Sequence, residues 1–268
     1  MNYTIIKYPR TPHIEGSRLQ PGDEDMSQRA FSEIAGRHIV IEEKIDGANT
    51  AVSFNSEGEL LLQSRGHYLS GGYRERHYNL FKQWATIQRD ALWNTLGYRH
   101  VMYGEWLYAK HSIYYDALPH YFIEFDILDR ETDRFLDTPS RRAITASLPV
   151  CSAAVLAEGV FSRIEDMLKY LGDSNYITED HIEHLRTAAE REGQDPDRIC
   201  RETDHRRTME GLYIKVEENG EVVDRMKFVR ATFLQVVEES KTHWLERPII
   251  PNGLTRPVEA LFMPTLEE

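Results

Sequence analysis

Two pairs of alternating apolar and polar segments most restrict how this chain can fold. Segments 49–55 and 59–65 are joined through the sequence NSEGE, and segments 211–217 and 221–229 flank Asn219 and Gly220. Alternation with a period of two residues is typical of a strand with one buried face, and Asn-Gly is a common hairpin turn. The chain is therefore expected to contain two antiparallel hairpins.

Other segments extend this pattern to a mixed fold. Strand-like segments occur at 38–43, 100–106 and 121–128, and apolar stripes with helical spacing occur at 75–95, 162–172 and between Thr178 and Gly193. Ser162 and Glu165 have the spacing of a capping box, and Gly97 follows the first stripe as a stop. We predict one α+β domain with antiparallel sheets and a mainly helical insertion over residues 140–208.

Composition sets the size of the core. The 268 residues are 41% hydrophobic, which is sufficient to bury the core of one large domain. Residues 1–230 are expected to form that domain. Residues 231–268 are too few for a second complete domain, and we expect them to form a short helix and a tail packed on the same domain. The helix would contain Phe233, Leu234, Val237 and Trp244.

Charge and targeting signals exclude some classes of protein. The net charge of -12 argues against nonspecific nucleic-acid binding, which needs clustered cations. No membrane-length apolar run occurs, and the N-terminus lacks the layout of a secretory signal, so we expect a cytoplasmic protein with no membrane partner. Cys151 and Cys200 are interpreted as buried or incidental thiols, and His181 and His184 share a helix face without an evident third metal ligand.

A local basic segment is nevertheless a candidate for contact with nucleic acid. Positive or titratable side chains gather between residues 65 and 82 and alternate with tyrosines: Arg65, His67, Arg74, Arg76, His77 and Lys82, with Tyr68, Tyr73 and Tyr78. Cations with interleaved aromatic side chains suit single-stranded nucleic acid. The alternative is that this segment is a solvated face.

The sequence IVIEEKIDGANTAVSFN, residues 39–55, interrupts two strand-like runs with Lys44, Asp46 and Gly47. A neutral lysine amine is a strong nucleophile, but its ordinary pKa of about 10.4 keeps it protonated at neutral pH unless its surroundings activate it. Gly47 allows the backbone to approach a ligand, and Asp46 would share the strand face of Lys44 if the extended conformation continues. These features suit a phosphate ligand, and the alternative is a surface Lys-Asp pair at a turn.

Five further motifs follow Lys44 in order: SRG (64–66), YGEW (103–106), EFDI (124–127), EGLYIKV (210–216) and MKF (226–228). Together with Lys44, this ordered set resembles the covalent nucleotidyltransferase superfamily of polynucleotide ligases and RNA capping enzymes, and most closely the ATP-dependent RNA ligases. The resemblance covers residues 38–230. It implies an antiparallel-sheet nucleotidyltransferase (adenylation) domain with a helical insertion and without a complete appended OB-fold.

The resemblance also implies roles for individual residues. Lys44 would attack the α-phosphate of ATP and become a lysyl-adenylate, releasing pyrophosphate. Glu210 is similar to the acid that helps to hold the catalytic Mg²⁺ or Mn²⁺, and Lys227 and Lys215 are similar to the lysines directed at the nucleotide phosphates. The other residues implied in ATP binding are Glu43, Asp46, Gly47, Asn49, Arg65 at the ribose and phosphate, Glu105 at the ribose, and Phe125 stacked on adenine.

The chemistry of nucleotidyl transfer independently requires such groups. Lysines and Mg²⁺ together neutralise the negative charge that develops on the phosphates. A cluster of cations would also lower the pKa of Lys44 and help to free its amine. Periodicity alone is equally compatible with Phe125 as a core residue and with Glu210 as the end of a loop.

Two features depart from the family pattern or add to it. Family members commonly carry a second lysine two positions after the one that matches Lys227, but Val229 stands there. Either Lys227 suffices or a local bulge brings in Arg230, which alternation points to the other face. In the sequence WLYAKHSIYYD, residues 106–116, we hypothesise that Lys110 and His111 face a 5′-phosphate or triphosphate.

The sequence therefore predicts an ATP-dependent RNA ligase that acts in RNA repair and joins RNA 5′-phosphate and 3′-hydroxyl ends, with an end-healing kinase or phosphatase as a candidate partner. The alternatives are a noncatalytic RNA-end or nucleotide-binding module, a DNA ligase, and a GTP-dependent capping-type enzyme. The last two generally attach an OB-fold after the final motif, and only residues 231–268 follow Arg230. The substrate is left open between a duplex nick, a broken loop and a single strand.

Overall fold

The computed structural model describes residues 4–19, 23, 26–234 and 248–263. The strands form one sheet in the order β3-β2-β4-β5-β6-β10-β9-β1-β8, with β7 paired to β5. The β5–β7 pair is parallel, and the other strand pairs are antiparallel. The strands are β1 (His38–Lys44), β2 (Ala48–Phe54), β3 (Leu60–Ser64), β4 (His100–Trp106), β5 (Phe122–Asp129), β6 (Arg134–Leu136), β7 (Cys151–Ser152), β8 (Val155–Val160), β9 (Gly211–Glu218) and β10 (Glu221–Val229).

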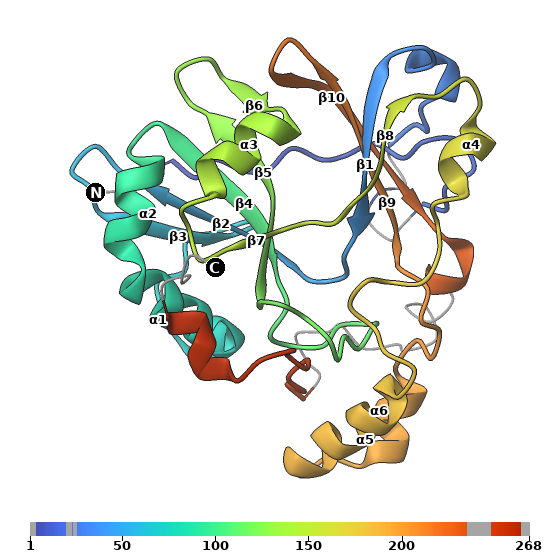
Figure 1. Ribbon diagram of the computed structural model, residues 1–268. Helices are drawn as coiled ribbons and strands as arrows, with labels where there is room; N and C mark the ends of the chain where they lie inside the picture. Colours follow the sequence, from blue (N-terminus) through green and yellow to red (C-terminus); the bar gives the residue numbers. More distant parts are fainter. Residues whose placement is uncertain (1–3, 20–22, 24–25, 235–247, 264–268) are drawn as a thin grey trace.

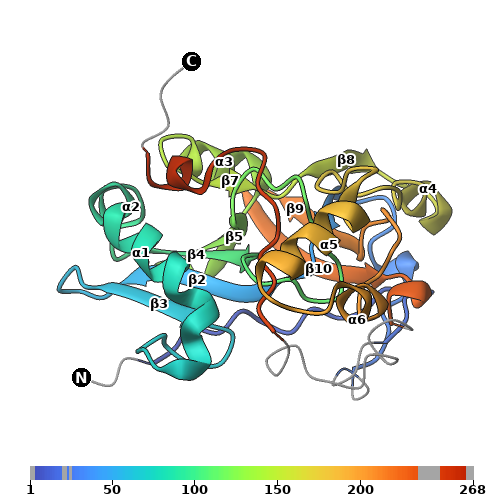
Figure 2. The same cartoon turned by 90° about the horizontal axis from the view of Figure 1, so that it is seen from below.

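The sheet consists of two halves that meet at the short strand β6. This strand pairs with the end of β5 on one side and with the start of β10 on the other. Figure 1 shows β2 to β5 beside the helices α1 (Asn79–Ile87) and α2 (Arg89–Leu96), and β1, β8, β9 and β10 beside α4 (Ile164–Leu168). Figure 2 shows the same separation from below. Within the part of the chain that the structure describes, the strand ladders of the two halves are joined at β6, and side-chain hydrogen bonds such as the one from Lys215 to the carbonyl of Phe125 add to this connection.

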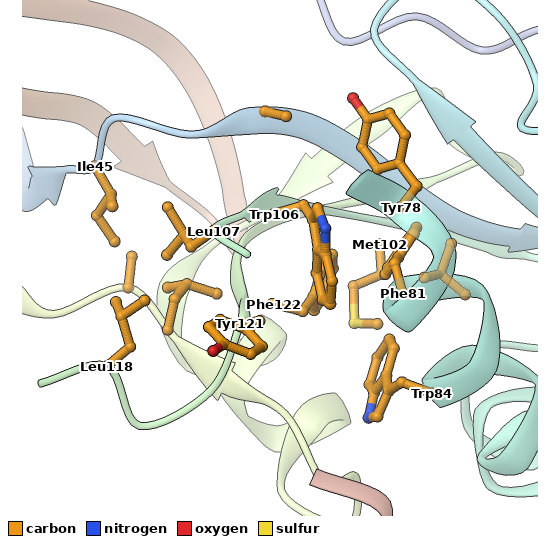
Figure 3. Close-up of a cluster of buried hydrophobic side chains, with 14 of the residues drawn as sticks. Ile45, Tyr78, Phe81, Trp84, Met102, Trp106, Leu107, Leu118, Tyr121 and Phe122 are labelled. Carbon is orange, nitrogen blue, oxygen red and sulfur yellow. The ribbon is translucent and has the colours of Figure 1, made fainter. Parts of the chain in front are cut away.

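The first half packs an aromatic core under α1. Phe81 and Trp84 of this helix are fully buried against Trp106 of β4 and Phe122 of β5. The ring centroids of Trp84 and Phe122 are 5.3 Å apart, and those of Phe81 and Trp106 are 5.1 Å apart. Figure 3 shows these rings stacked between the helix and the strands. The predicted apolar stripe of residues 75–95 thus fixes the helix pair on this half of the sheet.

The second half has a separate aliphatic core. Ile39 and Ile41 of β1 pack with Ile214 of β9 and Met226 of β10. The N-terminal segment adds Ile14, which is fully buried in the same cluster. This segment also forms a parallel bridge to β10, because residue 13 pairs with residue 227. The N-terminal segment is therefore built into the second half of the sheet.

The seven strands expected from alternation are confirmed, each within one residue of its predicted ends. The description of residues 140–208 as mainly helical is incomplete, because β7 and β8 lie in this region and join the sheet beside α3 (Thr138–Thr145), α4, α5 (His181–Arg191) and α6 (Pro196–Arg201). The capping box predicted at Ser162 is wrong, since α4 starts at Ile164 and its N-cap, Arg163, makes no side-chain cap hydrogen bond. The segment 75–95 is divided into η2 (Tyr73–Tyr78), α1 and α2.

The C-terminal region contacts the first half where it is described. Phe233 and Leu234 are buried in the aromatic core, whereas the predicted helix residues Val237 and Trp244 lie outside the described residues. The side chain of Asn252 donates to the carbonyl of Leu107 at 2.7 Å, and the helix η4 (Val258–Phe262) packs near α1. Within the described ranges, no helix has the length and apolarity that crossing a membrane would require.

Candidate active site

A cavity of about 1430 Å³ lies where the ends of strands from both halves of the sheet come together. Its lining includes the end of β1, the start of β2, the middle of β4 and β5, the start of β9, and Lys227 of β10. Most of the residues that the family resemblance singles out line it: Glu43, Lys44, Asp46, Gly47, Asn49, Arg65, Glu105, Phe125, Glu210 and Lys227. Lys215 and Arg230 are absent from the lining.

Lys44 is the last residue of β1, and its amine points at Glu210. The Nζ atom donates to Oε2 of Glu210 at 2.7 Å, and the side chain of Lys44 is 20% exposed whereas that of Glu210 is 2% exposed. The two residues come together because Lys44 stands opposite Gly211 in the β1–β9 ladder. The strand register therefore places the candidate nucleophile beside a buried carboxylate.

Two glycines close to this pair have no room for a side chain. A Cβ on Gly211 would lie 1.8 Å from the carbonyl oxygen of Phe228, so the position after Glu210 must be glycine for β9 and β10 to pair. A Cβ on Gly47 would lie 2.5 Å from Leu107 Cδ2 and 3.1 Å from the carbonyl oxygen of Trp106. Both glycines are thus required by strand packing at the cavity, independently of any ligand.

The surroundings of Lys44 keep its amine protonated. Burial alone would lower the pKa of Lys44, but the carboxylates of Glu210, Glu105 and Asp46 outweigh burial and raise this pKa above its ordinary value. The prediction that a cationic cluster lowers the pKa of Lys44 is wrong, because the groups that act most strongly on its amine are acids. A nucleophilic Lys44 therefore requires a bound group that takes up the negative charge of Glu210.

Glu105 presents a carboxyl group to the cavity from β4. Its Oε2 atom is buried and has no hydrogen-bond partner among the residues that the structure describes, and Asn49 of β2 stands opposite Glu105 in the strand ladder. Burial raises the pKa of Glu105 to about 8, with Lys44 opposing the shift and Glu210 adding to it. A carboxyl group that keeps its proton near neutral pH can donate a hydrogen bond to an oxygen atom of a ligand.

Replacing Glu105 with glutamine should stabilise the protein at high pH only. The pKa of Glu105 is raised from its ordinary value of 4.5 to about 8 in the folded protein. The stability that the protonated form provides is therefore complete below pH 4.5 and is lost as the pH rises from there through about 8. We expect thermal unfolding of Glu105→Gln at about 2–4 °C above wild type near pH 8.5 and at the wild-type temperature near pH 5. The control is Glu131→Gln, at an exposed glutamate. A difference that does not vary with pH would contradict the assignment.

Asp46 does not continue β1. The strand ends at Lys44, and the carboxylate of Asp46 accepts hydrogen bonds from the backbone N–H groups of Ser112 and Ile113 at 2.8 and 3.0 Å. The Nδ1 atom of His111 lies 3.7 Å from the other oxygen of Asp46. The prediction that Asp46 shares the strand face of Lys44 is therefore wrong. Asp46 instead anchors the loop that follows β4 against the cavity.

Glu43 lines the cavity but directs its carboxylate elsewhere. The carboxylate accepts hydrogen bonds from Ser174 Oγ at 2.5 Å and from the backbone and side-chain nitrogens of Asn175 at 3.0 and 2.7 Å. Burial raises the pKa of Glu43, although these hydrogen bonds oppose the shift. Glu43 therefore holds the turn at residues 174–175, and its contacts do not match the nucleotide-binding role expected from the sequence.

Phe125 forms part of an aromatic wall. Its ring is half-buried and makes edge contact with Tyr8, with centroids 5.1 Å apart, and a tilted contact with Tyr213 at 6.1 Å. The hydroxyl groups of Tyr8 and Tyr213 contact each other, and Tyr8 also donates to Asp126. A half-buried ring at a cavity wall offers a face on which a planar base can stack.

Lys215 lies behind this wall and does not reach the cavity. Its side chain is fully buried, with Nζ 2.9 Å from Glu42 and 3.0 Å from Asp126, and it donates to the carbonyl of Phe125. Burial opposes the ionisation of Asp126, but Lys215 is foremost among the cations that hold its pKa below the usual range. The geometry therefore departs from the predicted contact of Lys215 with nucleotide phosphates. Lys215 positions the strand that carries Phe125.

Arg230 follows β10, and its side chain makes its contacts outside the cavity. Its guanidinium is buried and binds the carboxylate of Asp204, the carbonyl of Met209 at 2.7 Å and that of Thr208 at 3.1 Å. No bulge brings Arg230 into the cavity, whereas Lys227 lines it. Arg230 therefore fixes the loop that leads to Glu210, and Lys227 is the basic residue of the last motif that reaches the cavity.

The basic segment 65–82 contributes a rim rather than one continuous patch. Arg65 and Arg74 are exposed at the cavity, and the guanidinium of Arg76 lies 4.4 Å from the centre of the Tyr73 ring, which is 80% exposed. Two side chains of this segment, His77 and Lys82, do not match the expected charged surface. His77 is buried, which lowers its pKa to about 4, and Lys82 pairs with Glu75 at 2.5 Å.

Lys110 and His111 differ in their relation to the cavity. Lys110 lines it, but its Nζ atom donates to the backbone carbonyls of His111 and Glu202 at 3.0 and 3.4 Å. His111 is buried and faces Asp46. Their hypothesised contact with a 5′-phosphate thus requires both side chains to leave these partners.

A model of the RNA ligase family matches residues 37–229, which include Lys44, Glu210 and Phe125. The chain belongs to the RNA ligase family. No curated protein matches this chain. Solved structures with a similar fold include the RNA ligase of Naegleria gruberi with PPi, at 15% identity and a TM-score of 0.54, covering 89% of this chain and 60% of that ligase.

Two mutants of the same Naegleria gruberi ligase are also similar to this RNA ligase family member. The mutant with ATP and Mn has 13% identity and a TM-score of 0.53, covering 86% of this chain and 58% of that one. The mutant with AMP and Mn has 13% identity and a TM-score of 0.54, covering 88% and 59%. At these identities the likeness shows a shared fold, and the chain spans about 60% of the length of that ligase.

Some residues of the site in this RNA ligase family member carried no signal in the sequence. Tyr8, Pro9 and Thr11 line the cavity from a segment without periodicity, and they reach it because that segment pairs with β10. Tyr213 lies two residues before Lys215 on β9, so alternation placed it on the same face. A search for aromatic residues on that face would have found it.

Proposed function

We propose that the chain is an ATP-dependent RNA ligase that adenylates itself on Lys44, transfers AMP to an RNA 5′-phosphate and joins that end to a 3′-hydroxyl. In the first step, the deprotonated Nζ of Lys44 forms a bond to the α-phosphorus. The bond from this phosphorus to the bridging oxygen breaks, and its electron pair leaves with pyrophosphate. The proton of the Lys44 ammonium is lost to solvent before attack.

The observation that carries this proposal is a largely buried ion pair that opens on a cavity of about 1430 Å³, which has room for a nucleotide. Lys44 is held 2.7 Å from Glu210, with Phe125 on the cavity wall and Lys227 on its lining. In the second step an oxygen of the RNA 5′-phosphate attacks the phosphorus of the lysyl-adenylate, and Lys44 leaves. In the third step the 3′-hydroxyl attacks the activated 5′-phosphate, and AMP leaves with the electron pair. RNA repair is the role that these steps support.

ATP and a divalent cation are the cofactors that we propose. The Naegleria gruberi structures with ATP and Mn and with AMP and Mn support both. Among the residues that the structure describes, no group of three or more His, Cys, Asp or Glu side chains is placed to hold a metal ion. Mg²⁺ commonly takes one or two carboxylates together with substrate phosphates, and the buried Glu210 fits that use. The bound cation would neutralise Glu210 and the phosphates.

The test of the proposed function is the joining of an RNA strand with a labelled 5′-phosphate. Wild-type protein with ATP and Mg²⁺ should convert this strand first to an adenylated form and then to a product resistant to phosphatase. A DNA strand of the same sequence in parallel identifies the polynucleotide. Binding of RNA without an adenylated intermediate would favour a noncatalytic RNA-end binding module instead.

Neutralising the cavity rim should weaken RNA binding. Arg74→Gln together with Arg76→Gln removes two cations next to the exposed Tyr73. Since each phosphate contact contributes about 0.7 to the slope of log K against log salt for single strands, the double variant should flatten this slope by roughly one unit. The measurement is RNA affinity over a range of KCl concentrations.

The matched control for the rim is the double variant Arg134→Gln and Arg163→Gln. These arginines are 60% and 70% exposed, pair with surface acids and do not line the cavity. The control should keep the wild-type affinity and salt slope. If the rim variant also keeps both, the RNA strand follows another surface.

A further inference from the structure

One carboxylate next to the cavity residue Lys227 is surrounded by hydrogen-bond donors. Asp23 accepts a hydrogen bond from Lys227 Nζ at 2.5 Å and from Arg10 at 3.0 Å, and His13 Nε2 lies 3.2 Å from the same oxygen that Lys227 contacts. The side chain of Asp23 is only 13% exposed. Burial opposes its ionisation, but the hydrogen bonds from Lys227, Arg10 and His13 lower the pKa of Asp23 to about 2. The cluster of Arg10, His13 and Lys227 thus binds an anion.

The backbone fixes two of these side chains, those of His13 and Lys227, independently of Asp23. The N–H of Lys227 donates to the carbonyl of Pro12 at 2.9 Å, and the N–H of Ile14 donates to the carbonyl of Lys227 at 3.0 Å. His13 lies between these two hydrogen bonds, is fully buried, and contacts Ser17 Oγ through Nδ1 at 2.7 Å. The N-terminal segment therefore holds His13 next to Lys227 as part of the sheet.

The cluster is continuous with the cavity that contains Lys44. Pro9 and Thr11, which flank Arg10 in the chain, line this cavity, and so does Lys227. Thr11 is held there by a contact with the hydroxyl of Tyr213 at 3.2 Å. The positive charge of Lys44 also acts on both His13 and Lys227, which shows that the cluster and the candidate nucleophile share one electrostatic environment.

Nucleotidyl transfer needs an anion site in this place. The leaving pyrophosphate carries more negative charge than the α-phosphate, and in an in-line displacement it must be held on the side of the α-phosphorus away from the Lys44 amine. Phosphate oxygens accept hydrogen bonds from arginine, lysine and a histidine N–H in the same geometry as carboxylate oxygens. Because pyrophosphate offers more oxygens and more charge than one carboxylate, it can replace Asp23 on these three side chains.

We propose that Arg10, His13 and Lys227 bind the β- and γ-phosphates of ATP and the released pyrophosphate, and that the Asp23 carboxylate competes for the same site. This inference rests on the proposed function of the cavity. Asp23 is then an internal competitor that lowers the affinity for nucleotide. Arg10 and His13 are binding residues for the leaving group and have no contact with RNA in the later steps.

The test compares two variants in self-adenylation, which releases pyrophosphate, and in the sealing of adenylated RNA, which does not. Asp23→Asn should lower the KM for ATP in self-adenylation by about threefold to tenfold, because it removes a competing occupant of the site. Arg10→Ala should raise this KM about tenfold, the effect of one charge-assisted hydrogen bond. The concentration of pyrophosphate that discharges AMP from the adenylated protein should move in the same directions.

The second measurement is the sealing of RNA that already carries a 5′-adenylate, a step without pyrophosphate. Its rate should change less than twofold in both variants relative to wild type. The control Arg37→Ala removes an arginine of the second half that pairs with Glu218 outside the cavity, and it should match wild type in every assay.

The outcomes distinguish this inference from the proposed function. An unchanged or higher KM for ATP in Asp23→Asn would overturn the competitor role, and equal losses of self-adenylation and of sealing in Arg10→Ala would overturn the pyrophosphate site. Wild-type protein that neither takes AMP from ATP nor seals adenylated RNA would overturn the proposed function itself, and this inference with it.

Discussion

Replacing Lys44 with alanine or arginine is expected to reduce self-adenylation by ATP to below detection. Alanine removes the nucleophile. Arginine keeps the positive charge that pairs with Glu210 at the cavity but has no nucleophilic amine at any accessible pH. Lys44→Arg therefore separates the chemical role from the ion pair. The measurement is the transfer of labelled AMP to each purified protein, with thermal unfolding to show that both are folded.

The same variants should still seal RNA that carries a 5′-adenylate, because this step does not use the amine as a nucleophile. A matched control is Lys169→Ala, which removes an exposed lysine that pairs with Asp166 on the surface and should leave adenylation unchanged. Adenylation of Lys44→Arg at more than a few per cent of the wild-type rate would contradict the assignment of Lys44, since another residue would then accept AMP.

Replacing Lys215 with methionine is expected to destabilise the protein by about 3–5 kcal/mol, because it leaves the buried carboxylates of Glu42 and Asp126 without their shared cation. The loss corresponds to a decrease in the unfolding temperature of roughly 10 °C or more. The neighbouring Arg141 contacts Glu42 but also binds Glu124, so it does not substitute for Lys215 at Asp126. The measurement is thermal and urea unfolding.

The control for Lys215 is Lys169→Met, at a lysine that is 65% exposed, and its effect should stay within about 1 kcal/mol. The two roles of Lys215 predict different results. A phosphate ligand would lose affinity for ATP at unchanged unfolding temperature, whereas a buried structural cation loses stability first. Unchanged stability with a large rise in the KM for ATP would contradict the structural role.

Strands of five or more residues that are rich in apolar side chains could be predicted from the sequence, and the shorter or more exposed strands could not. β1, β2 and β9 are mostly buried, and their ends were found to within one residue. β8 lies at the edge of the sheet with both faces partly exposed, so its sequence VLAEGV shows no alternation between buried and exposed positions. β6 and β7 have only three and two residues, too few for a period to appear.

The residues of the candidate site also differ in how far the sequence could predict them. Lys44 and Glu210 are 166 residues apart in the chain. The order of the motifs, more than any local pattern, indicated that the two residues belong to one site. Lys215 was placed with the phosphate ligands because its motif resembles that of the family, but the match of a motif does not show that the side chain is buried on Glu42 and Asp126. The shared face of Asp46 and Lys44 depended on an extended conformation that continues past the predicted end of the strand, whereas β1 ends at Lys44.

The contacts around the N-terminal segment could not be predicted for a different reason. Arg10, His13 and Asp23 lie in a region without periodic hydrophobicity, and their relation to Lys227 depends on one backbone bridge between distant parts of the chain. Loops of this kind are placed by tertiary hydrogen bonds that leave no local pattern. The side chains of this cluster could therefore be identified only in the folded structure.

The most direct test of the account is incubation of wild-type protein with Mg²⁺ and α-labelled ATP or GTP, followed by a denaturing gel and mapping of the labelled peptide. Protein freed of bound AMP beforehand should take covalent label from ATP alone, on the peptide that contains Lys44. Label from GTP would indicate a capping-type enzyme, and the absence of label from both nucleotides on folded protein would contradict nucleotidyl transfer by this cavity.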